Sequence, residues 1–226
     1  MRAVNWLRLF LNRPLDAAVM TDNIHLYQGD VPDDFRLPGS LAIDTETMGL
    51  IHGRDRLCLV QMSNGNGEAH LVQIANGQRH APNLKKLIET TTEPVLMHFA
   101  RFDIASLKAG LDIDVPMVFC TKIASKISRS FTNRHGLKDL CLELLSIDIS
   151  KQQQSSDWGA ETLSEAQLAY AASDVLHLHK IAEKLKTMLD REERQDLAKA
   201  HFDFLSTRAA MDLLGWETRD LFAHSG

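Results

Sequence analysis

A short apolar run that ends in two closely spaced carboxylates places the strongest constraint on how this chain can fold. Residues 41–47 read Leu-Ala-Ile-Asp-Thr-Glu-Thr, and the apolar half is typical of a strand buried on both faces. Side chains two positions apart on a strand point the same way, so Asp44 and Glu46 share a face and Thr45 points away. Adjacent carboxylates resist ionisation unless a positive charge lies between them, which a divalent cation such as Mg²⁺ or Mn²⁺ provides. Taken alone, the pattern is equally typical of a strand that runs into an acidic turn.

The remaining apolar runs predict an α/β protein with a mixed sheet. We expect strands at residues 25–27, 41–47, 57–62, 69–74, 94–98 and 115–120, with an Asn-Gly-Asn-Gly hairpin turn at 64–67. We expect helices at 82–90, 99–109, 122–128, 137–145, 163–189 and 192–214. Gly110 is the expected stop of the second helix, Thr121 the cap of the third, and Ser164 with Gln167 a capping box. Because the first strands follow one another without helices between them, the sheet cannot be a strict alternation of parallel strands and helices.

Composition is that of one globular domain. The chain has 226 residues, of which 44% are apolar and 24% charged. Cys58, Cys120 and Cys141 are widely spaced among apolar residues, which predicts reduced thiols in a cytoplasmic protein. No apolar run is long enough to span a bilayer, so no membrane contact is expected. The net charge of −5 argues against a long non-specific nucleic-acid footprint and favours a grip on a short piece.

Residues 1–19 differ from the rest of the chain. They combine Arg2, Arg8 and Arg13 with a cluster of large apolar residues. A membrane-surface helix or an organelle presequence would share these features. The regular pattern of strands and helices begins only near Ile24, and we therefore interpret 1–19 as an extension upstream of a start at Met20, followed by a single domain at 20–226.

Three further residues with acidic or phenolic side chains come later in the chain. Asp103 ends the segment 98–103, His-Phe-Ala-Arg-Phe-Asp, where a strand gives way to a helix. Tyr170 and Asp174 are spaced i and i+4, so they lie on one face of the helix predicted there. Each pattern alone is common on ordinary helices.

In this order, the motifs D-x-E, H-x-x-x-F-D and Y-x-x-x-D resemble the RNase D branch of the DEDD superfamily of 3′→5′ exonucleases, which has four acidic ligands and a tyrosine. The similarity extends through Ser-Asp-Trp at 156–158, through 163–174, and through the segments 121–126 and 136–140. Full RNase D proteins continue into helical nucleic-acid-binding domains, whereas this chain ends soon after Trp216. Its size and the pattern at 25–32 are similar to nano-RNase C, a family of stand-alone bacterial oligoribonucleases.

The resemblance implies a fold, an activity and an assembly. The fold would be ribonuclease H-like, a mixed five-stranded sheet of order 3-2-1-4-5 flanked by helices. The activity would be metal-dependent hydrolysis of short single-stranded RNA, mainly dinucleotides, to 5′-mononucleotides, and the assembly an octameric ring. Trimming of tRNA or other longer RNA, or hydrolysis of DNA, remains open within the same class. A catalytically silent nucleic-acid-binding module is the alternative from another class, which the intact acidic positions disfavour.

The same resemblance assigns roles to residues of this chain. Asp44, Glu46, Asp103 and Asp174 would hold two divalent ions, Mg²⁺ or Mn²⁺, and Tyr170 would position the attacking water. The candidate substrate contacts are Thr45, Thr47, Met48, Leu50, His98, Arg101 and Phe102. For Phe102 plain core packing is an equal alternative, and for His98 a supporting role. Basic residues near the motifs are candidates for a 5′-phosphate contact, namely Arg101, Lys122, Lys126, Arg129 and Arg134.

The last predicted helix carries more large apolar residues than one buried face requires. They are Phe202, Phe204, Leu205, Met211, Leu213, Leu214 and Trp216. Two interpretations remain open, a subunit contact in a symmetric oligomer and completion of the monomer core.

Overall fold

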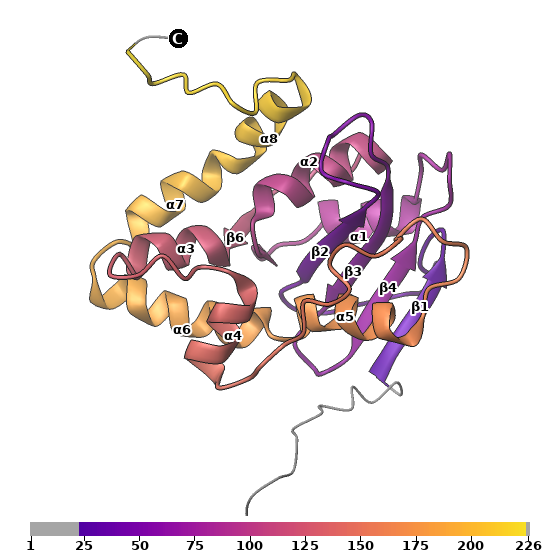
Figure 1. Ribbon diagram of the computed structural model, residues 1–226, viewed down its shortest axis with the longest axis horizontal. Coiled ribbons are helices and arrows are strands. Elements are labelled where there is room, and N and C mark those ends of the chain that lie inside the picture. Colours follow the sequence, from indigo (N-terminus) through magenta and orange to yellow (C-terminus); the bar gives the residue numbers. More distant parts are fainter. Residues whose placement is uncertain (1–22, 225–226) are drawn as a thin grey trace, which may run out of the picture.

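The strand that carries Asp44 and Glu46 lies inside a six-stranded mixed sheet in the computed structural model, which describes residues 23–224 (Figure 1). The strands are β1 (Ile24–Gln28), β2 (Ala42–Thr47), β3 (Leu57–Ser63), β4 (Ala69–Gln73), β5 (Val95–Met97) and β6 (Val118–Cys120). Their order across the sheet is β1-β4-β3-β2-β5-β6. The acidic strand β2 is therefore internal, and it pairs with β3 in antiparallel and with β5 in parallel orientation.

The sequence patterns predicted all six strands, whereas the family resemblance implied five. The strands from β2 to β6 have the implied order, because numbering them from one along the chain gives 3-2-1-4-5. The difference is β1, which pairs in parallel with β4 at the edge of the sheet. The ribonuclease H-like α/β fold is confirmed, with this sixth strand as a correction.

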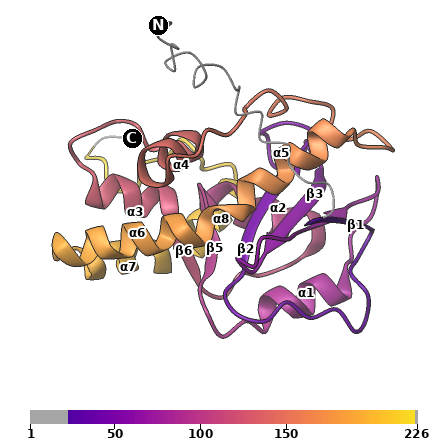
Figure 2. The same cartoon turned by 90° about the horizontal axis from the view of Figure 1, so that it is seen from below.

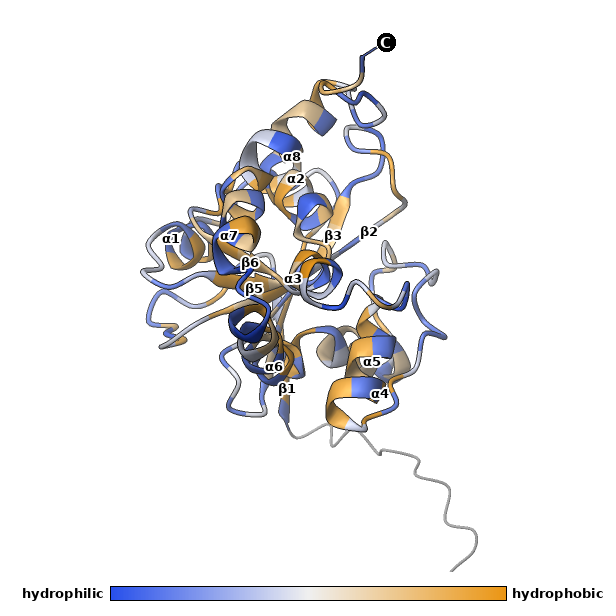
Figure 3. Ribbon diagram, turned by 90° about the vertical axis from the view of Figure 1, so that its left-hand side faces the viewer, coloured by the Kyte–Doolittle hydropathy of each residue, from blue (hydrophilic) through white to orange (hydrophobic). Residues whose placement is uncertain are grey.

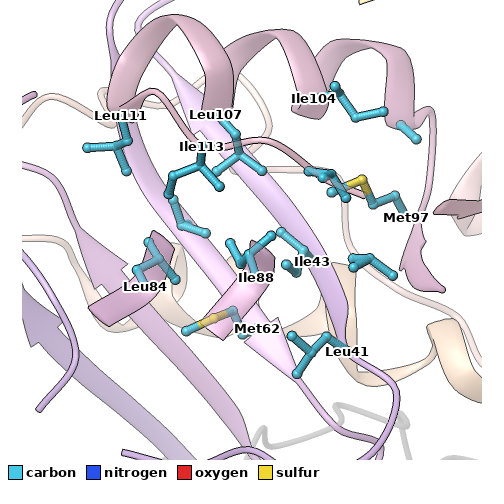
Figure 4. Packing of buried hydrophobic residues seen from close by; sticks show 14 of the residues in the cluster. Leu41, Ile43, Met62, Leu84, Ile88, Met97, Ile104, Leu107, Leu111 and Ile113 are labelled. Atoms are coloured by element: carbon cyan, nitrogen blue, oxygen red, sulfur yellow. The ribbon is translucent and has the colours of Figure 1, made fainter. Parts of the chain in front are cut away.

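Helices cover both faces of the sheet, and each face has its own apolar core (Figure 2). On one face, α1 (Pro82–Glu89) and α2 (Ala100–Leu111) pack on the strands, and Figure 4 shows apolar side chains that the helices and strands contribute to this core. On the other face, α5 (Glu165–Leu176) packs on β2, β3 and β4. Because β2 and β3 are covered on both sides, their sequences contain the apolar runs from which they were predicted.

The remaining helices lie beside the end of the sheet formed by β5 and β6 (Figure 1). They are α3 (Thr121–Ser128), α4 (Leu137–Leu145), α6 (Leu178–Arg191) and α7 (Gln195–Asp203). The last helix, α8 (Leu205–Leu213), packs on α2. Hydrophobic and hydrophilic stretches occur side by side on the helices in Figure 3, as expected for helices with one buried side.

Two helices that the sequence predicted as continuous are each divided. The helix expected at 163–189 is interrupted at His177, and the helix expected at 192–214 is interrupted at Phe204. Packing explains both divisions, because α5 lies on the sheet while α6 packs on α3 and α4, and α7 packs on α3 while α8 packs on α2. One straight helix cannot follow two differently oriented surfaces. The capping box of Ser164 and Gln167 at the start of α5 is confirmed.

Two predicted helix-end signals serve other purposes. Gly110 lies inside α2, which ends at Asp112 in the left-handed conformation. A Cβ at position 110 would lie 2.8 Å from the Cβ of Leu57, so the glycine permits close approach of α2 to β3. Thr121 makes no capping bond at α3, and its hydroxyl donates to the backbone carbonyl of Met97.

The predictions about cysteines and membranes have separate outcomes. Cys58, Cys120 and Cys141 are buried and free, as expected. Among residues 23–224, no helix is long and apolar enough to cross a membrane. The predicted extension at 1–19 and the start at Met20 lie outside the described residues.

The contact between Gly110 and Leu57 predicts that Gly110→Ala destabilises the protein. Alanine is the better helix former by about 0.5–1 kcal/mol, but overpacking a tight contact costs about 1–3 kcal/mol. Ala109→Gly, at the neighbouring exposed position, measures the propensity effect alone. Urea unfolding of the three proteins decides the sign, and a Gly110→Ala variant more stable than the parent would contradict the close-packing explanation.

Candidate active site

Three carboxylates meet at the end of β2. Oxygen atoms of Asp44 and Glu46 on β2 and of Asp174 on α5 lie within 4.8 Å of one another. Asp44 and Glu46 share a face because they are two residues apart on the strand. Asp174 reaches that face because α5 carries Ala171 and Ala172, both completely buried, where it packs on the sheet. Small side chains there allow the helix to approach closely.

Asp103 comes to the same region from the opposite face of the sheet. It lies in the first turn of α2 and is only 3% exposed. The hydroxyl of Thr45, which points to that face, donates a hydrogen bond of 2.7 Å to Asp103 Oδ1. Asp103 is not within the 4.8 Å group, although its charge acts on Asp44 and Glu46. The acids thus form a group of three with a fourth beside it.

Burial is the main reason why all four carboxyls hold protons more tightly than usual. The pKa of Glu46 is raised to about 9, and the pKa of Asp103 and of Asp174 to about 7. The pKa of Asp44 is also raised well above its ordinary value, by desolvation and by repulsion from the three other acids. Near neutral pH the cluster therefore keeps protons that isolated carboxyls would have released.

The acid cluster has the properties of a site for hard cations. Within residues 23–224, no lysine or arginine forms a salt bridge with any of the four acids. All ligand atoms offered are carboxylate oxygens, which Mg²⁺ and Mn²⁺ prefer. Buried carboxylates without a cationic side chain are stabilised by a bound cation, so the residues present fit a divalent metal.

The acids line one part of a cavity of about 630 Å³. Three lysines, Lys122, Lys138 and Lys151, also line it. Phe99 stands at the junction of β5 and α2 with φ of 65°, is 46% exposed, and has the Lys122 ammonium 4.2 Å from its ring centre. The cavity thus offers carboxylates, ammonium groups and aromatic surface to one ligand.

Most of the predicted site residues line this cavity. They are Asp44, Thr45, Glu46, Thr47, Met48, Leu50, His98, Phe102, Asp103, Tyr170 and Asp174. The two threonines predicted to contact substrate already donate hydrogen bonds within the chain. The Thr45 hydroxyl donates to Asp103, and the Thr47 hydroxyl donates to the carbonyl of Gly49. Met48 and Leu50 are exposed, Leu50 by 78%, so they remain available to a substrate.

The predicted roles of several basic residues need correction. Arg101 does not line the cavity, because its guanidinium binds the buried carboxylate of Asp212 on α8. Arg129 is 3% exposed and binds Glu143 on α4. Lys126 and Arg134 also lie outside the lining, whereas Lys122 is part of it. Arg101 and Arg129 therefore connect helices through ion pairs. Their position near the motifs gave no sign of these partners.

Sequence reasoning missed other lining residues. Lys138 belongs to the segment 136–140 noted for its family similarity, but that similarity assigned it no role, and Lys151 belongs to no motif at all. Trp158 was noted only as part of the Ser-Asp-Trp similarity. It is 2% exposed, and its ring centre lies 6.0 Å from that of Tyr170. The buried tryptophan ring therefore lies directly beside the tyrosine ring.

Two lining residues have defined protonation states. Burial lowers the pKa of His98 to about 3, with help from Lys122 and Lys151, so its imidazole is neutral. Its Nδ1 lies within hydrogen-bond distance, 2.9 Å, of the Thr121 hydroxyl. Burial and the nearby carboxylates raise the pKa of Tyr170, so its hydroxyl stays protonated.

A sequence profile described as 3′-5′ exonuclease matches residues 31–190, and the chain belongs to this 3′-5′ exonuclease family. Curated relatives include DNA polymerase I of Aquifex aeolicus, 34% identical over 180 residues, and ribonuclease D of Gluconacetobacter diazotrophicus, 32% identical over 169 residues. The matches cover 76% and 75% of this chain, but only 29% and 42% of those relatives. The chain thus spans less than half the length of either relative.

Solved structures give a closer match. NrnC of Brucella melitensis superimposes with a TM-score of 0.86 and 51% identity, over 90% of this chain and 100% of that one. Structures of the same Brucella protein with bound Mg²⁺ and bound to pGG have TM-scores of 0.84 and 0.85, at 50% and 51% identity. RNase D of Escherichia coli, at 21% identity and a TM-score of 0.66, shares the fold. The resemblance to the RNase D branch and to nano-RNase C is confirmed.

The raised pKa values predict an unusual pH dependence of stability in metal-free protein. Carboxyls with a higher pKa in the folded than in the unfolded chain bind more protons when folded, so stability falls as pH rises. The decline should run from the ordinary carboxyl pKa of about 4 through the pKa values of about 7 and about 9. Asp103→Asn removes one such group, so it should be more stable than the parent at pH 9, on the order of 2–4 kcal/mol, with a clearly smaller gain at pH 5.

Denaturant unfolding in the presence of a chelator at pH 5, 7 and 9 measures this difference. Asp190→Asn, at an exposed position outside the cavity, is the control for a generic loss of one acid. Equal stability of the parent protein at the three pH values, or parallel curves for both variants, would show that the acids do not repel one another as described.

Proposed function

We propose that this chain is a metal-dependent 3′→5′ exoribonuclease that hydrolyses short RNA, above all dinucleotides, to 5′-mononucleotides. The observation that carries the proposal is one cavity that holds both the acid cluster and three lysines. A short substrate has few phosphates, so its affinity depends on a pocket that holds it on several sides rather than on a long basic track. The Brucella relative solved with pGG supports the same substrate class.

The acids supply the proposed metal site. Asp44, Glu46, Asp103 and Asp174 would hold two divalent cations, Mg²⁺ or Mn²⁺, as the Mg²⁺-bound relative also suggests. Bound there, such cations polarise the phosphodiester and stabilise charge on the attacking and leaving oxygens. The Thr45 side chain lies on the face of β2 away from Asp44 and Glu46, and its hydrogen bond holds Asp103 in a fixed orientation. The acids give up their protons when the cations bind.

Tyr170 is the proposed positioning group for the attacking water. Its hydroxyl remains protonated beside the acid cluster, so it can both donate and accept a hydrogen bond. The neighbouring Trp158 ring limits its movement. A water held by this hydroxyl has a fixed direction of approach to the phosphorus, and such orientation contributes strongly to rate.

The rest of the cavity would bind the nucleotides. Met48, Leu50 and Phe99 expose apolar surface against which bases can pack. Lys122, Lys138 and Lys151 offer ammonium groups to phosphate oxygens away from the bond that is cleaved. A substrate held in this way is fixed at its bases and at its phosphates.

We also propose a homo-oligomer, with the octameric ring of the family resemblance as its form, in a cytoplasmic setting. Leu205 and Met211 of the last helix are buried within the monomer. Leu214 and Trp216 remain exposed, and Phe222 beyond them is 89% exposed. Exposed apolar residues on a projecting segment (Figure 1) are suited to a contact with another copy.

A panel of labelled substrates with Mn²⁺ or Mg²⁺ tests the proposal. An RNA dinucleotide should be hydrolysed faster than a 20-mer RNA. It should also be hydrolysed faster than the DNA dinucleotide of the same sequence and faster than duplex DNA. A chelator should stop release of mononucleotides from all of them. Equal turnover of the dinucleotide and the 20-mer would contradict the proposed preference for short substrates. Faster hydrolysis of DNA than of RNA would contradict the proposed preference for RNA.

Variants in the same assay locate the chemistry. Asp44→Asn should release no product, whereas Tyr170→Phe should lose most turnover but still bind metal, since only the hydroxyl is removed. Full activity of Asp44→Asn with excess metal contradicts the site. Light scattering on the same preparation tests assembly, and a single-chain mass at micromolar concentration contradicts the ring.

A further inference from the structure

Gln61 is a polar residue that follows the apolar first part of β3. It lies directly opposite Asp44 in the antiparallel pairing of β2 and β3, and it is completely buried. Cross-strand partners point to the same face, so the amide of Gln61 lies next to the carboxylate of Asp44. Its Nε2 donates a hydrogen bond of 3.4 Å to Asp44 Oδ2.

The environment of Gln61 fixes which way its amide points. Its Oε1 is buried and has no hydrogen-bond partner within the part of the chain that the structure describes. With Asp44 ionised, as it would be when it binds a cation, the opposite orientation would place Oε1 against a carboxylate oxygen, so two acceptors would face each other. A buried amide with one unpaired atom is less stable than an apolar side chain of the same size. The contact with Asp44 is therefore a reason for an amide at this position.

We propose that Gln61 is a positioning residue for cation binding, which fixes one oxygen of Asp44 and leaves the other free for the cation. The inference rests on the proposed function, because it concerns the metal site assigned there. Within residues 23–224, Gln61 is the side-chain donor to Asp44, which otherwise receives the backbone N–H of Thr45. A residue that hydrogen-bonds to one oxygen of a metal ligand fixes the direction of the other oxygen, and such contacts raise metal affinity.

Replacement of the amide by a side chain of equal length tests the inference. Gln61→Met retains the packing but loses the donor, so calorimetric titration with Mn²⁺ alone should show affinity about 10-fold to 100-fold lower than in the parent. Excess Mn²⁺ should restore much of the dinucleotide hydrolysis, because the ligands themselves are intact.

Gln73→Met is the matched control. Gln73 is a buried glutamine on the neighbouring strand β4, but its amide donates to the backbone carbonyls of Ala160 and Glu161. Its replacement should lower stability without a change in Mn²⁺ affinity. Unchanged Mn²⁺ binding by Gln61→Met, in a protein whose parent binds Mn²⁺ and releases mononucleotides, overturns the role of Gln61 alone. A parent that binds no Mn²⁺ overturns the proposed function and this inference together.

A measurement on the parent protein covers the case in which Gln61→Met does not fold. The side-chain amide signals of Gln61 and Gln73 can be followed by NMR during titration with Mg²⁺. The Gln61 signals should shift as the carboxylate beside them binds the cation, while the Gln73 signals stay in place. Gln61 signals that do not respond to saturating Mg²⁺ would also overturn the inference.

Discussion

Repulsion among buried carboxylates is the constraint on which the rest of this structure depends. Asp44, Glu46 and Asp174 place oxygen atoms within 4.8 Å of one another, and Asp103 lies beside them. In a poorly hydrated environment such a group keeps protons or binds cations. Proton retention at neutral pH lowers stability, because the unfolded chain releases those protons, and ionisation of the folded cluster without a cation costs still more. The carboxyls of the site can therefore exchange their protons for a metal ion. The stability of the fold and the binding of metal thus depend on the same groups.

The sheet makes this crowding possible because helices approach β2 from both faces. α5 brings Asp174 and Tyr170 to one face, where Ala171 and Ala172 permit close packing. α2 brings Asp103 from the other face, and Gly110 plays the same part near Leu57. Apolar cores on both sides hold these helices in place. The free energy from burial of apolar side chains thus offsets the repulsion of the acids.

The sequence was sufficient for what depends on local patterns. Alternation on β2 placed Asp44 and Glu46 on one face, and helical spacing placed Tyr170 beside Asp174. It was insufficient where partners are distant in the chain. Arg101 lies within the motif that ends at Asp103, but it binds Asp212, 111 residues away.

The same limit applies to the division of long helices and to the lining of the cavity. Both breaks, at His177 and Phe204, occur where packing changes from one neighbour to another. Lys151 enters the cavity from a loop without any pattern of its own. Only the assembled fold shows such contacts.

Proton release on metal binding tests the central claim most directly. The metal-free protein should hold protons on the acid cluster at pH 7, because the pKa of Glu46 is about 9 and those of Asp103 and Asp174 are about 7. Calorimetric titration with Mg²⁺ at pH 7, in buffers with different ionisation enthalpies, counts the protons released. The account predicts release of at least about one proton per protein, with less release at higher pH. Metal binding with no release of protons at pH 7 would contradict it.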